Sequence, residues 1–287
     1  NRYNQIEEQA DLGFAPDSSF PLTYAEKGLL QVKLHGPGWE DRPLQAGRAL
    51  NVVPDKATYK GERLEELLPV IEQSGVKYTE EAGAVTILGL SKHSKDAAEG
   101  VNAIVGLAES LSLIQPHPAL LFIADAVGED ATGAALFGEI KDEPSGALSF
   151  NIATLSIDEE RSEIGIDIRI PVLADKDALV ERLTEVAASY QLQYEEFDYV
   201  APLYVPLDSP LVSTLMEVYQ EETGDQTPAM SSGGATFART MENCVAYGAL
   251  FPDALQTEHQ ANERAKLDDL YRAMAVSYTH LRAHETG

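Results

Sequence analysis

Residues 231–263 constrain this chain most, because they place a sharp turn, an apolar run and a polar loop in immediate succession. The paired glycines Gly233 and Gly234 let the backbone turn tightly and bring its N–H groups close to an anionic ligand. The apolar run 244–251 is long enough for one buried strand. The loop after it carries His259 among acidic residues, where a neutral imidazole can bind a divalent metal and a carboxylate can orient it. An ordinary surface histidine is the competing interpretation.

Three motifs follow one another in this stretch. They read Gly-Gly-Ala-Thr-Phe-Ala-Arg at 233–239, Gly-Ala-Leu-Phe-Pro at 248–252 and His-Gln-Ala-Asn-Glu at 259–263. In this order they resemble the C-terminal signature of the PepV/Sapep-type dipeptidases, which belong to the di-metal M20 peptidase family. The resemblance implies an α/β fold, in which a β-α-β sandwich lid domain is inserted into a discontinuous M20-type catalytic domain, here only partial.

The order of elements along the chain agrees with that organisation. Strand, helix and hairpin patterns recur within 29–203, which we expect to be the lid domain. The catalytic domain is then expected in two segments, 1–28 and 204–275. Residues 276–287 match nothing in the family and resemble the translation of a transposon-library sequencing adapter, so we predict a non-native tail there.

Several individual elements can be predicted from periodicity. Helices are expected at 62–74, 102–113, 177–189 and 211–223, and further helical character is expected at 120–127. Two alternating strands, 147–157 and 163–170, flank a polar hairpin loop. The apolar run 244–251 is expected to be a single strand.

Charge and composition exclude several classes of protein. The 287 residues carry 21 basic and 47 acidic side chains, a formal net charge of −26. Such a surface repels phosphate backbones, so no nucleic-acid partner is expected. No apolar run approaches the roughly 18–20 residues that a membrane helix needs, so no membrane partner is expected either. The single cysteine, Cys244, excludes an internal disulfide and suits a reducing cytoplasm, where we expect the protein to be located.

The segment 13–28 provides a candidate metal ligand. Its Gly-Phe-Ala-Pro-Asp-Ser-Ser-Phe-Pro run, with the Ala-Glu-Lys-Gly that follows, looks like the metal-aspartate segment of the family. That match implies that Asp17 is a metal ligand. The alternative is structural, because an aspartate after proline commonly forms a turn.

Three residues of the expected lid match positions that bind substrate in the family. Asn51 lies in a run similar to Gly-x-x-x-Asn-x-Val-Pro-Asp-x-Ala, and an asparagine can orient a substrate through both donor and acceptor. His93 lies in a run similar to the lid motif Gly-x-x-x-His-x-x-x-Pro-x-x-Gly-x-Asn-Ala, although alanine replaces the usual proline. Arg169 ends a strand before Ile-Pro, where its guanidinium can fork onto a carboxylate.

Each of these three also has a structural interpretation. Asn51 is equally compatible with a strand edge or turn, and His93 with a helix cap or surface group. Arg169 is compatible with a strand arginine that pairs with a surface acid.

The resemblance implies hydrolysis of dipeptides with two divalent metal ions, zinc or manganese. Asp17 would hold one ion and His259 the other, while His93 would act as the catalytic oxyanion donor. Asn51, His93 and Arg169 would bind the substrate, together with backbone donors at residues 233 and 234. The other metal ligands and the glutamate base of the family are expected upstream of residue 1, so this chain alone is expected to be an inactive fragment.

Two other interpretations stay open. One is another M20 hydrolase, an aminoacylase or tripeptidase, built on the same ligands. The other is a non-catalytic binding or oligomerisation module of the lid type.

Overall fold

The computed structural model describes residues 6, 8, 10–255, 257 and 262–285, and for residues 279–285 it describes only the course of the helix. The chain forms two compact units. The terminal unit comprises Asn1–Lys27 and Ala201–Gly287, and the middle unit comprises Gly28–Val200. The units divide at 27/28 and 200/201, where the expected domain limits are 28/29 and 203/204, and their identity as catalytic and lid domains stays a prediction.

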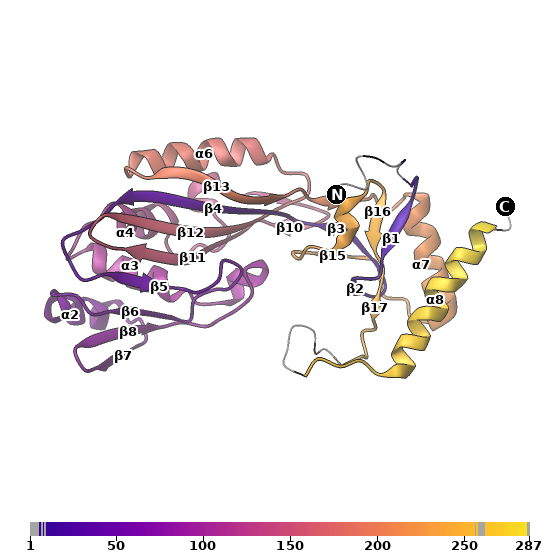
Figure 1. The fold of residues 1–287 in the computed structure, drawn as a ribbon, viewed down its shortest axis with the longest axis horizontal. Coiled ribbons are helices and arrows are strands. Elements are labelled where there is room, and N and C mark those ends of the chain that lie inside the picture. Colours follow the sequence, from indigo (N-terminus) through magenta and orange to yellow (C-terminus); the bar gives the residue numbers. More distant parts are fainter. Residues whose placement is uncertain (1–5, 7, 9, 256, 258–261, 286–287) are drawn as a thin grey trace. The chain divides into compact units, whose positions relative to one another are not determined.

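The middle unit is built on a five-stranded antiparallel sheet of order β13-β4-β12-β11-β5 (Figure 1). Its central strands are long because apolar side chains alternate along them; in β4, residues 30, 32 and 34 are fully buried on one face. The strands are β4 (Gly28–Pro37), β5 (Leu44–Ala46), β11 (Ser149–Ile157), β12 (Arg161–Ile170) and β13 (Gln193–Val200).

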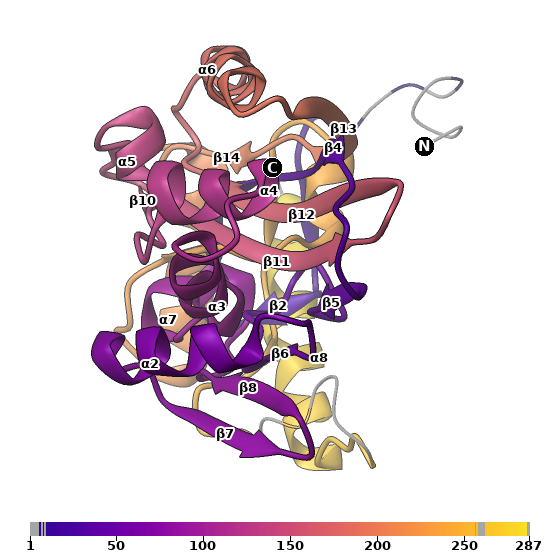
Figure 2. The same ribbon diagram turned by 90° about the vertical axis from the view of Figure 1, so that its left-hand side faces the viewer.

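A smaller sheet and several helices complete the middle unit (Figure 2). Strands β6 (Lys56–Tyr59), β7 (Tyr78–Glu81) and β8 (Ala84–Leu88) form a sheet of order β6-β8-β7. Helix α3 (Ala103–Ser112) contacts both sheets, and α2 (Leu64–Ser74) packs on α3.

The remaining elements of this unit are short, apart from α6 (Lys176–Ser189), which packs beside β13. They are the 3₁₀ helix η1 (Ser94–Glu99), α4 (Pro118–Leu121), the π-helix η2 (Phe122–Val127), α5 (Ala134–Phe137) and the pair β9 (Lys141–Asp142) and β10 (Gly146–Ala147). One hydrophobic core joins both sheets and the helices.

The terminal unit has its own sheet and its own core. Its strand order is β1-β16-β3-β14, with β15 also paired to β3 and a separate pair β2–β17. Helix α7 (Pro210–Thr223) contacts α8 (Leu267–Glu285) around a core in which the ring of Phe20 meets those of Tyr219, Tyr247 and Phe251. The strands are β1 (Gly13–Ala15), β2 (Ser18–Ser19), β3 (Thr23–Glu26), β14 (Leu203–Tyr204), β15 (Met230–Ser232), β16 (Cys244–Ala246) and β17 (Ala249–Leu250), and η3 (Phe237–Thr240) is a 3₁₀ helix.

The prediction of one strand over 244–251 is wrong. The run is divided into β16 and β17 at Gly248, whose φ is +75°. A Cβ at Gly248 would lie 2.4 Å from the Phe20 ring, so both the backbone conformation and the close packing require glycine here.

Helix α8 extends beyond the expected end of the domain at residue 275. It continues to Glu285, and Val276 is only 2% exposed within the core of the terminal unit. The non-native origin of residues 276–287 stays a prediction.

Candidate functional site

The structure brings together two of the predicted substrate-binding residues, Asn51 and His93. Val52 and His93 pair in an isolated antiparallel bridge, and the Asn51 carbonyl accepts a hydrogen bond from the Ser94 amide at 2.9 Å. Both side chains are exposed. The loop before β6 and the start of η1 therefore form one surface, although they are distant in sequence.

His93 is the N-cap of η1, and this role determines its tautomer. Its Nδ1 accepts the Lys95 amide at 3.2 Å, so the proton of the neutral ring belongs on Nε2. Partial desolvation and the charges of Arg169 and Lys95 lower the pKa of His93, against a smaller opposing effect of Asp167. The ring is thus a neutral donor with a fixed orientation.

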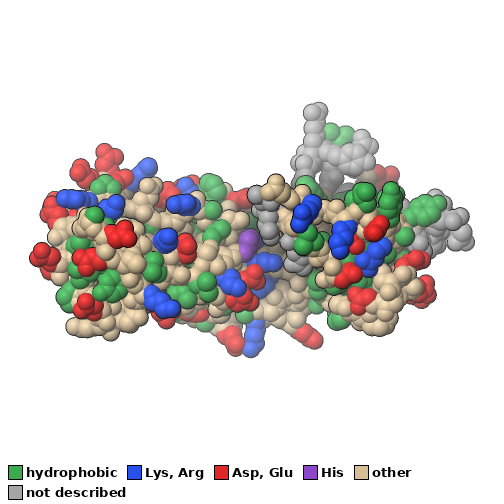
Figure 3. All heavy atoms as spheres, turned by 90° about the horizontal axis from the view of Figure 1, so that it is seen from below, with side chains coloured by type: hydrophobic (Ala, Val, Ile, Leu, Met, Phe, Trp, Pro, Cys, Tyr) green, Lys and Arg blue, Asp and Glu red, His purple; other side chains and the backbone are tan. Residues whose placement is uncertain are grey.

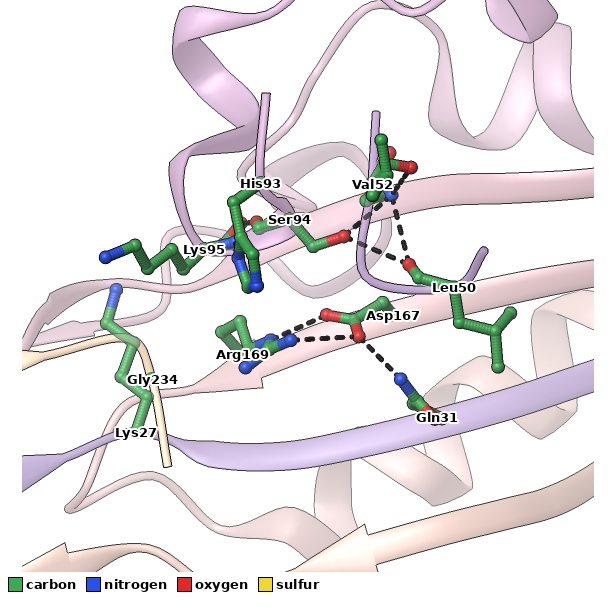
Figure 4. Close-up of polar contacts among 12 residues, drawn as sticks. Lys27, Gln31, Leu50, Val52, His93, Ser94, Lys95, Asp167, Arg169 and Gly234 are labelled. Carbon is green, nitrogen blue, oxygen red and sulfur yellow. Dashed lines mark hydrogen bonds and ion pairs between the residues drawn. The ribbon is translucent and has the colours of Figure 1, made fainter. Parts of the chain in front are cut away.

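Arg169 forms a buried ion pair within its own strand (Figure 4). Its Nε lies 2.6 Å from Asp167 Oδ1 and its Nη2 lies 3.1 Å from Asp167 Oδ2. Gln31 donates to the same Oδ2 at 2.9 Å. The acid is buried rather than at the surface, and it orients the guanidinium next to the His93 ring; binding of a substrate carboxylate by Arg169 stays a prediction.

Asp17 and the glycine loop lie in the terminal unit. Asp17 follows β1, is exposed, and accepts the Phe237 amide on Oδ2 at 3.0 Å. Gly233 and Gly234 follow β15, and the Gly234 amide donates to Ser232 Oγ at 2.9 Å. The η3 segment thus connects the glycine loop to the predicted metal ligand.

A buried ion pair holds this loop. Glu26 is fully buried and accepts Arg239 Nε at 2.7 Å, the Thr236 amide at 3.0 Å and the Thr236 hydroxyl at 2.6 Å. Arg239 also donates to the carbonyls of Gly234, Lys27 and Ala201. The pair therefore fixes the turn of the glycine loop. It also holds Lys27 and Ala201, the residues of the terminal unit that directly precede and follow the middle unit in sequence.

The predicted ligand His259 lies outside the described residues. Within the described part of the chain, no group of three or more His, Cys, Asp or Glu side chains is arranged to hold a metal ion. Of the two predicted ligands, Asp17 is the one within the described residues, and it presents an exposed carboxylate of the type that divalent ions bind. The described residues therefore fit one ligand position of such a centre. None of the described helices is long and apolar enough to span a membrane.

The sequence did not indicate Glu26, Asp167 or Asn151, which hold the candidate residues in place. For Asp167 a signal exists, because opposite charges two positions apart in a strand lie on one face. Glu26 lies between Ala25 and Lys27, and Asn151 between Phe150 and Ile152. The partners that such buried polar side chains need are revealed only by the fold.

Comparison with known proteins gives a consistent result. The model of peptidase family M20/M25/M40 matches residues 17–283. A Bacillus subtilis (strain 168) protein named "Putative dipeptidase YtjP" is 34% identical over 298 residues, covering 96% of this chain and 64% of that protein. A Staphylococcus aureus (strain MW2) protein named "Putative dipeptidase MW1694" is 29% identical over 301 residues, with the same coverage. The chain thus spans about 64% of the length of these relatives.

A similar fold occurs among solved structures. Aminoacylhistidine dipeptidase from Vibrio alginolyticus superimposes with a TM-score of 0.50 and 12% identity, covering 96% of this chain and 68% of that one.

Proposed function

The chain belongs to peptidase family M20/M25/M40, and from this premise we propose that the protein of which it forms part is a metal-dependent dipeptidase. The names of its relatives support the choice of short peptides as substrates. The observation that carries the proposal is the bridge between Val52 and His93, which brings Asn51 and His93 onto one surface. The His93 ring presents a neutral Nε2–H donor there, beside Arg169.

The metal centre is proposed to contain two divalent ions, zinc or manganese. Asp17 would bind one ion and His259 the other. The remaining ligands would come from the part of the family's length that this chain does not span. When bound, such ions polarise a carbonyl and lower the pKa of a coordinated water.

The side chains of the middle unit are proposed to bind and polarise the peptide. His93 would donate its Nε2 proton to the carbonyl oxygen as negative charge develops there. Its lowered pKa keeps the ring neutral, and the Lys95 amide holds it in one orientation. Arg169, oriented by Asp167, would bind the substrate carboxylate, and Asn51 would hydrogen-bond the peptide.

The terminal unit is proposed to contribute backbone donors. The N–H groups at Gly233 and Gly234 would bind the peptide from a loop that Glu26 and Arg239 hold in place. The Gly234 amide, which donates to Ser232 Oγ, would exchange that partner for the substrate. The single cysteine, Cys244, is buried, and it supports the further proposal of a reducing, cytoplasmic location.

Dipeptide hydrolysis by the full-length protein with manganese or zinc tests this function. His93→Ala should lower kcat by roughly 10²–10³-fold, the usual cost of losing one oxyanion donor. His35→Ala is the matched control, because His35 is another accessible histidine of the middle unit that pairs with Glu195.

Other outcomes of the assay would identify the alternatives. Hydrolysis of tripeptides or N-acyl amino acids in place of dipeptides would reassign the substrate within the family. Absence of any metal-dependent hydrolysis would favour a binding or oligomerisation module and would contradict the proposal.

A further inference from the structure

Asn151 is the third residue of β11 and is only 2% exposed. Its side-chain amide donates to the Val52 carbonyl at 3.0 Å, the Leu50 carbonyl at 3.4 Å and the Ser94 hydroxyl at 2.8 Å. Its Oδ1 accepts Asn102 Nδ2 at 3.2 Å. Every polar atom of this buried side chain therefore has a partner.

The partners of Asn151 flank the two proposed substrate-binding residues. Leu50 and Val52 lie on either side of Asn51, and Ser94 directly follows His93. One amide group thus binds both segments, which also bond each other directly through the Val53 amide and the Lys92 carbonyl at 2.8 Å. The backbone bond from the Ser94 amide to the Asn51 carbonyl then closes the arrangement.

Further contacts hold Ser94 and Asn151 in place. The Ser94 hydroxyl donates to the Leu50 carbonyl at 3.0 Å, and the Ser149 hydroxyl donates to the Ser94 carbonyl. Asn102 donates to the Ile152 carbonyl at 2.7 Å, while its Oδ1 caps α3 by accepting the Ile104 and Val105 amides. The position of Asn151 is thus tied to the sheet and to the first turn of α3.

A purely structural role would require only that Asn151 satisfy its own buried polar atoms. The choice of partners argues for an additional role in positioning the two loops. Its donors serve carbonyls and a hydroxyl of two loops that carry exposed side chains. A leucine of similar size would remove the donor to the Val52 carbonyl and to the Ser94 hydroxyl, and would leave that hydroxyl and the Leu50 carbonyl with only each other.

We propose that Asn151 is a positioning residue that sets the separation and orientation of Asn51 and His93. It acts through the loop carbonyls and Ser94 and does not itself touch substrate. The consequence of this positioning for catalysis rests on the proposed function, whereas the effect of Asn151 on the two loops does not.

The experiment is an NMR titration of the His93 ring in the 287-residue chain, with the signal assigned by its loss in His93→Gln. In Asn151→Leu the loops lose their common anchor. The pKa of His93, lowered in the parent by desolvation and by Arg169 and Lys95, should return toward the ordinary histidine value of about 6.5. Amide hydrogen exchange at Val53 and Ser94, which bond across the two loops, should become at least tenfold faster.

Ser162→Ala is the matched control, because this buried hydroxyl of neighbouring β12 has no hydrogen-bond partner among the described residues. It should change neither readout. An unchanged His93 pKa together with unchanged exchange at Val53 and Ser94 in folded Asn151→Leu would overturn the proposal.

Ser94→Ala gives a second, milder test, which remains decisive if Asn151→Leu does not fold. It removes one acceptor of Asn151 and should shift both readouts in the same direction by a smaller amount. No shift with Ser94→Ala would again overturn the proposal. Neither readout requires substrate, so failure of the dipeptidase assignment would be seen separately, in hydrolysis assays.

Discussion

Two arginines of this protein occupy similar environments at the residue scale. Arg169 and Arg239 are each about 5% exposed in their side chains, and each pairs with a fully buried carboxylate. Arg169 pairs within one strand, whereas Arg239 connects segments that are far apart in sequence. The cost of breaking such a pair is large, because the remaining charge stays buried without compensation.

Glu26→Gln should therefore destabilise the terminal unit strongly. Loss of one partner of a buried pair typically costs about 3–5 kcal/mol, measurable as a lower urea midpoint for the signal of this unit. Arg272→Met, which breaks an exposed pair with Asp253, should cost no more than about 1 kcal/mol. Equal midpoints for the two variants would show that the Glu26–Arg239 pair adds little.

Burial also makes His117 sensitive to pH. Its Nδ1 accepts the Ala119 amide and its Nε2 contacts the Pro37 carbonyl at 3.1 Å, an arrangement that suits the neutral ring. Desolvation lowers its pKa, although the backbone bonds oppose the shift. The unfolded chain consequently binds the proton more readily than the folded chain does.

This contribution to stability should be complete above about pH 6.5, the ordinary histidine pKa, and decline as the pH falls toward the lowered value. His117→Gln should lose less stability than the parent between pH 7.5 and 5.5 in urea titrations. Parallel losses in both proteins would assign the acid sensitivity to other groups.

The motifs suggested Asp17, Asn51, His93 and Arg169 as site residues because family patterns record residue type and spacing, and their roles stay predictions. The partners of these residues could not be read in the same way. Whether Asp167 or Asn151 is buried, and which carbonyl it meets, depends on strand pairing, and only the fold determines that.

At the scale of elements, local signals located the helices well. Helices α3, α6 and α7 are preceded by the N-cap residues Asn102, Asp175 and Ser209, each of which caps the first turn through its side chain. Their predicted limits agree to within one residue with the observed ones. The segment 120–127 is helical, but it contains a π-helix that periodicity does not distinguish. The prediction of a single strand over 244–251 failed because the break at Gly248 depends on packing against Phe20, a residue distant in sequence.

Gly248→Ala should show how much stability depends on glycine at the break between β16 and β17. The alanine would need an unfavourable φ of +75° and would also meet the Phe20 ring at 2.4 Å. Gly224→Ala is a matched control, because Gly224 has a φ of +73° at the end of α7 and no neighbouring atom within 4 Å. The control should cost about 1–2 kcal/mol for backbone strain alone, and Gly248→Ala clearly more. Similar thermal midpoints for both would exclude crowding as the reason for glycine at 248.

At the scale of the whole molecule, charged side chains are distributed differently from the buried hydrophobic ones. On the face drawn in Figure 3, acidic side chains are scattered among fewer basic ones and do not gather in a single patch. On this face the excess of acidic groups behind the net charge of −26 is therefore dispersed, and the absence of a nucleic-acid partner stays a prediction. The hydrophobic clusters, by contrast, separate between the two units.

The middle unit should consequently fold without the terminal unit. A fragment comprising residues 28–200 contains the whole of its core, both sheets and the Asn151 contacts. We expect cooperative urea unfolding and a His93 pKa equal to that in the whole chain. Non-cooperative unfolding, or a His93 pKa at the ordinary value, would show that the terminal unit is needed to form this unit.

The way in which the chain enters and leaves the middle unit has one more consequence. In the terminal unit β3 and β14, which flank the insertion in sequence, pair antiparallel with Glu26 opposite Leu203. In the middle unit β4 and β13, its first and last strands, pair antiparallel with Leu29 opposite Val200. The middle unit is therefore inserted where the turn of a β-hairpin formed by β3 and β14 would otherwise be. A turn of a few residues would suffice to join these two strands directly, so exchange or deletion of residues 28–200 would preserve the pairing of β3 with β14.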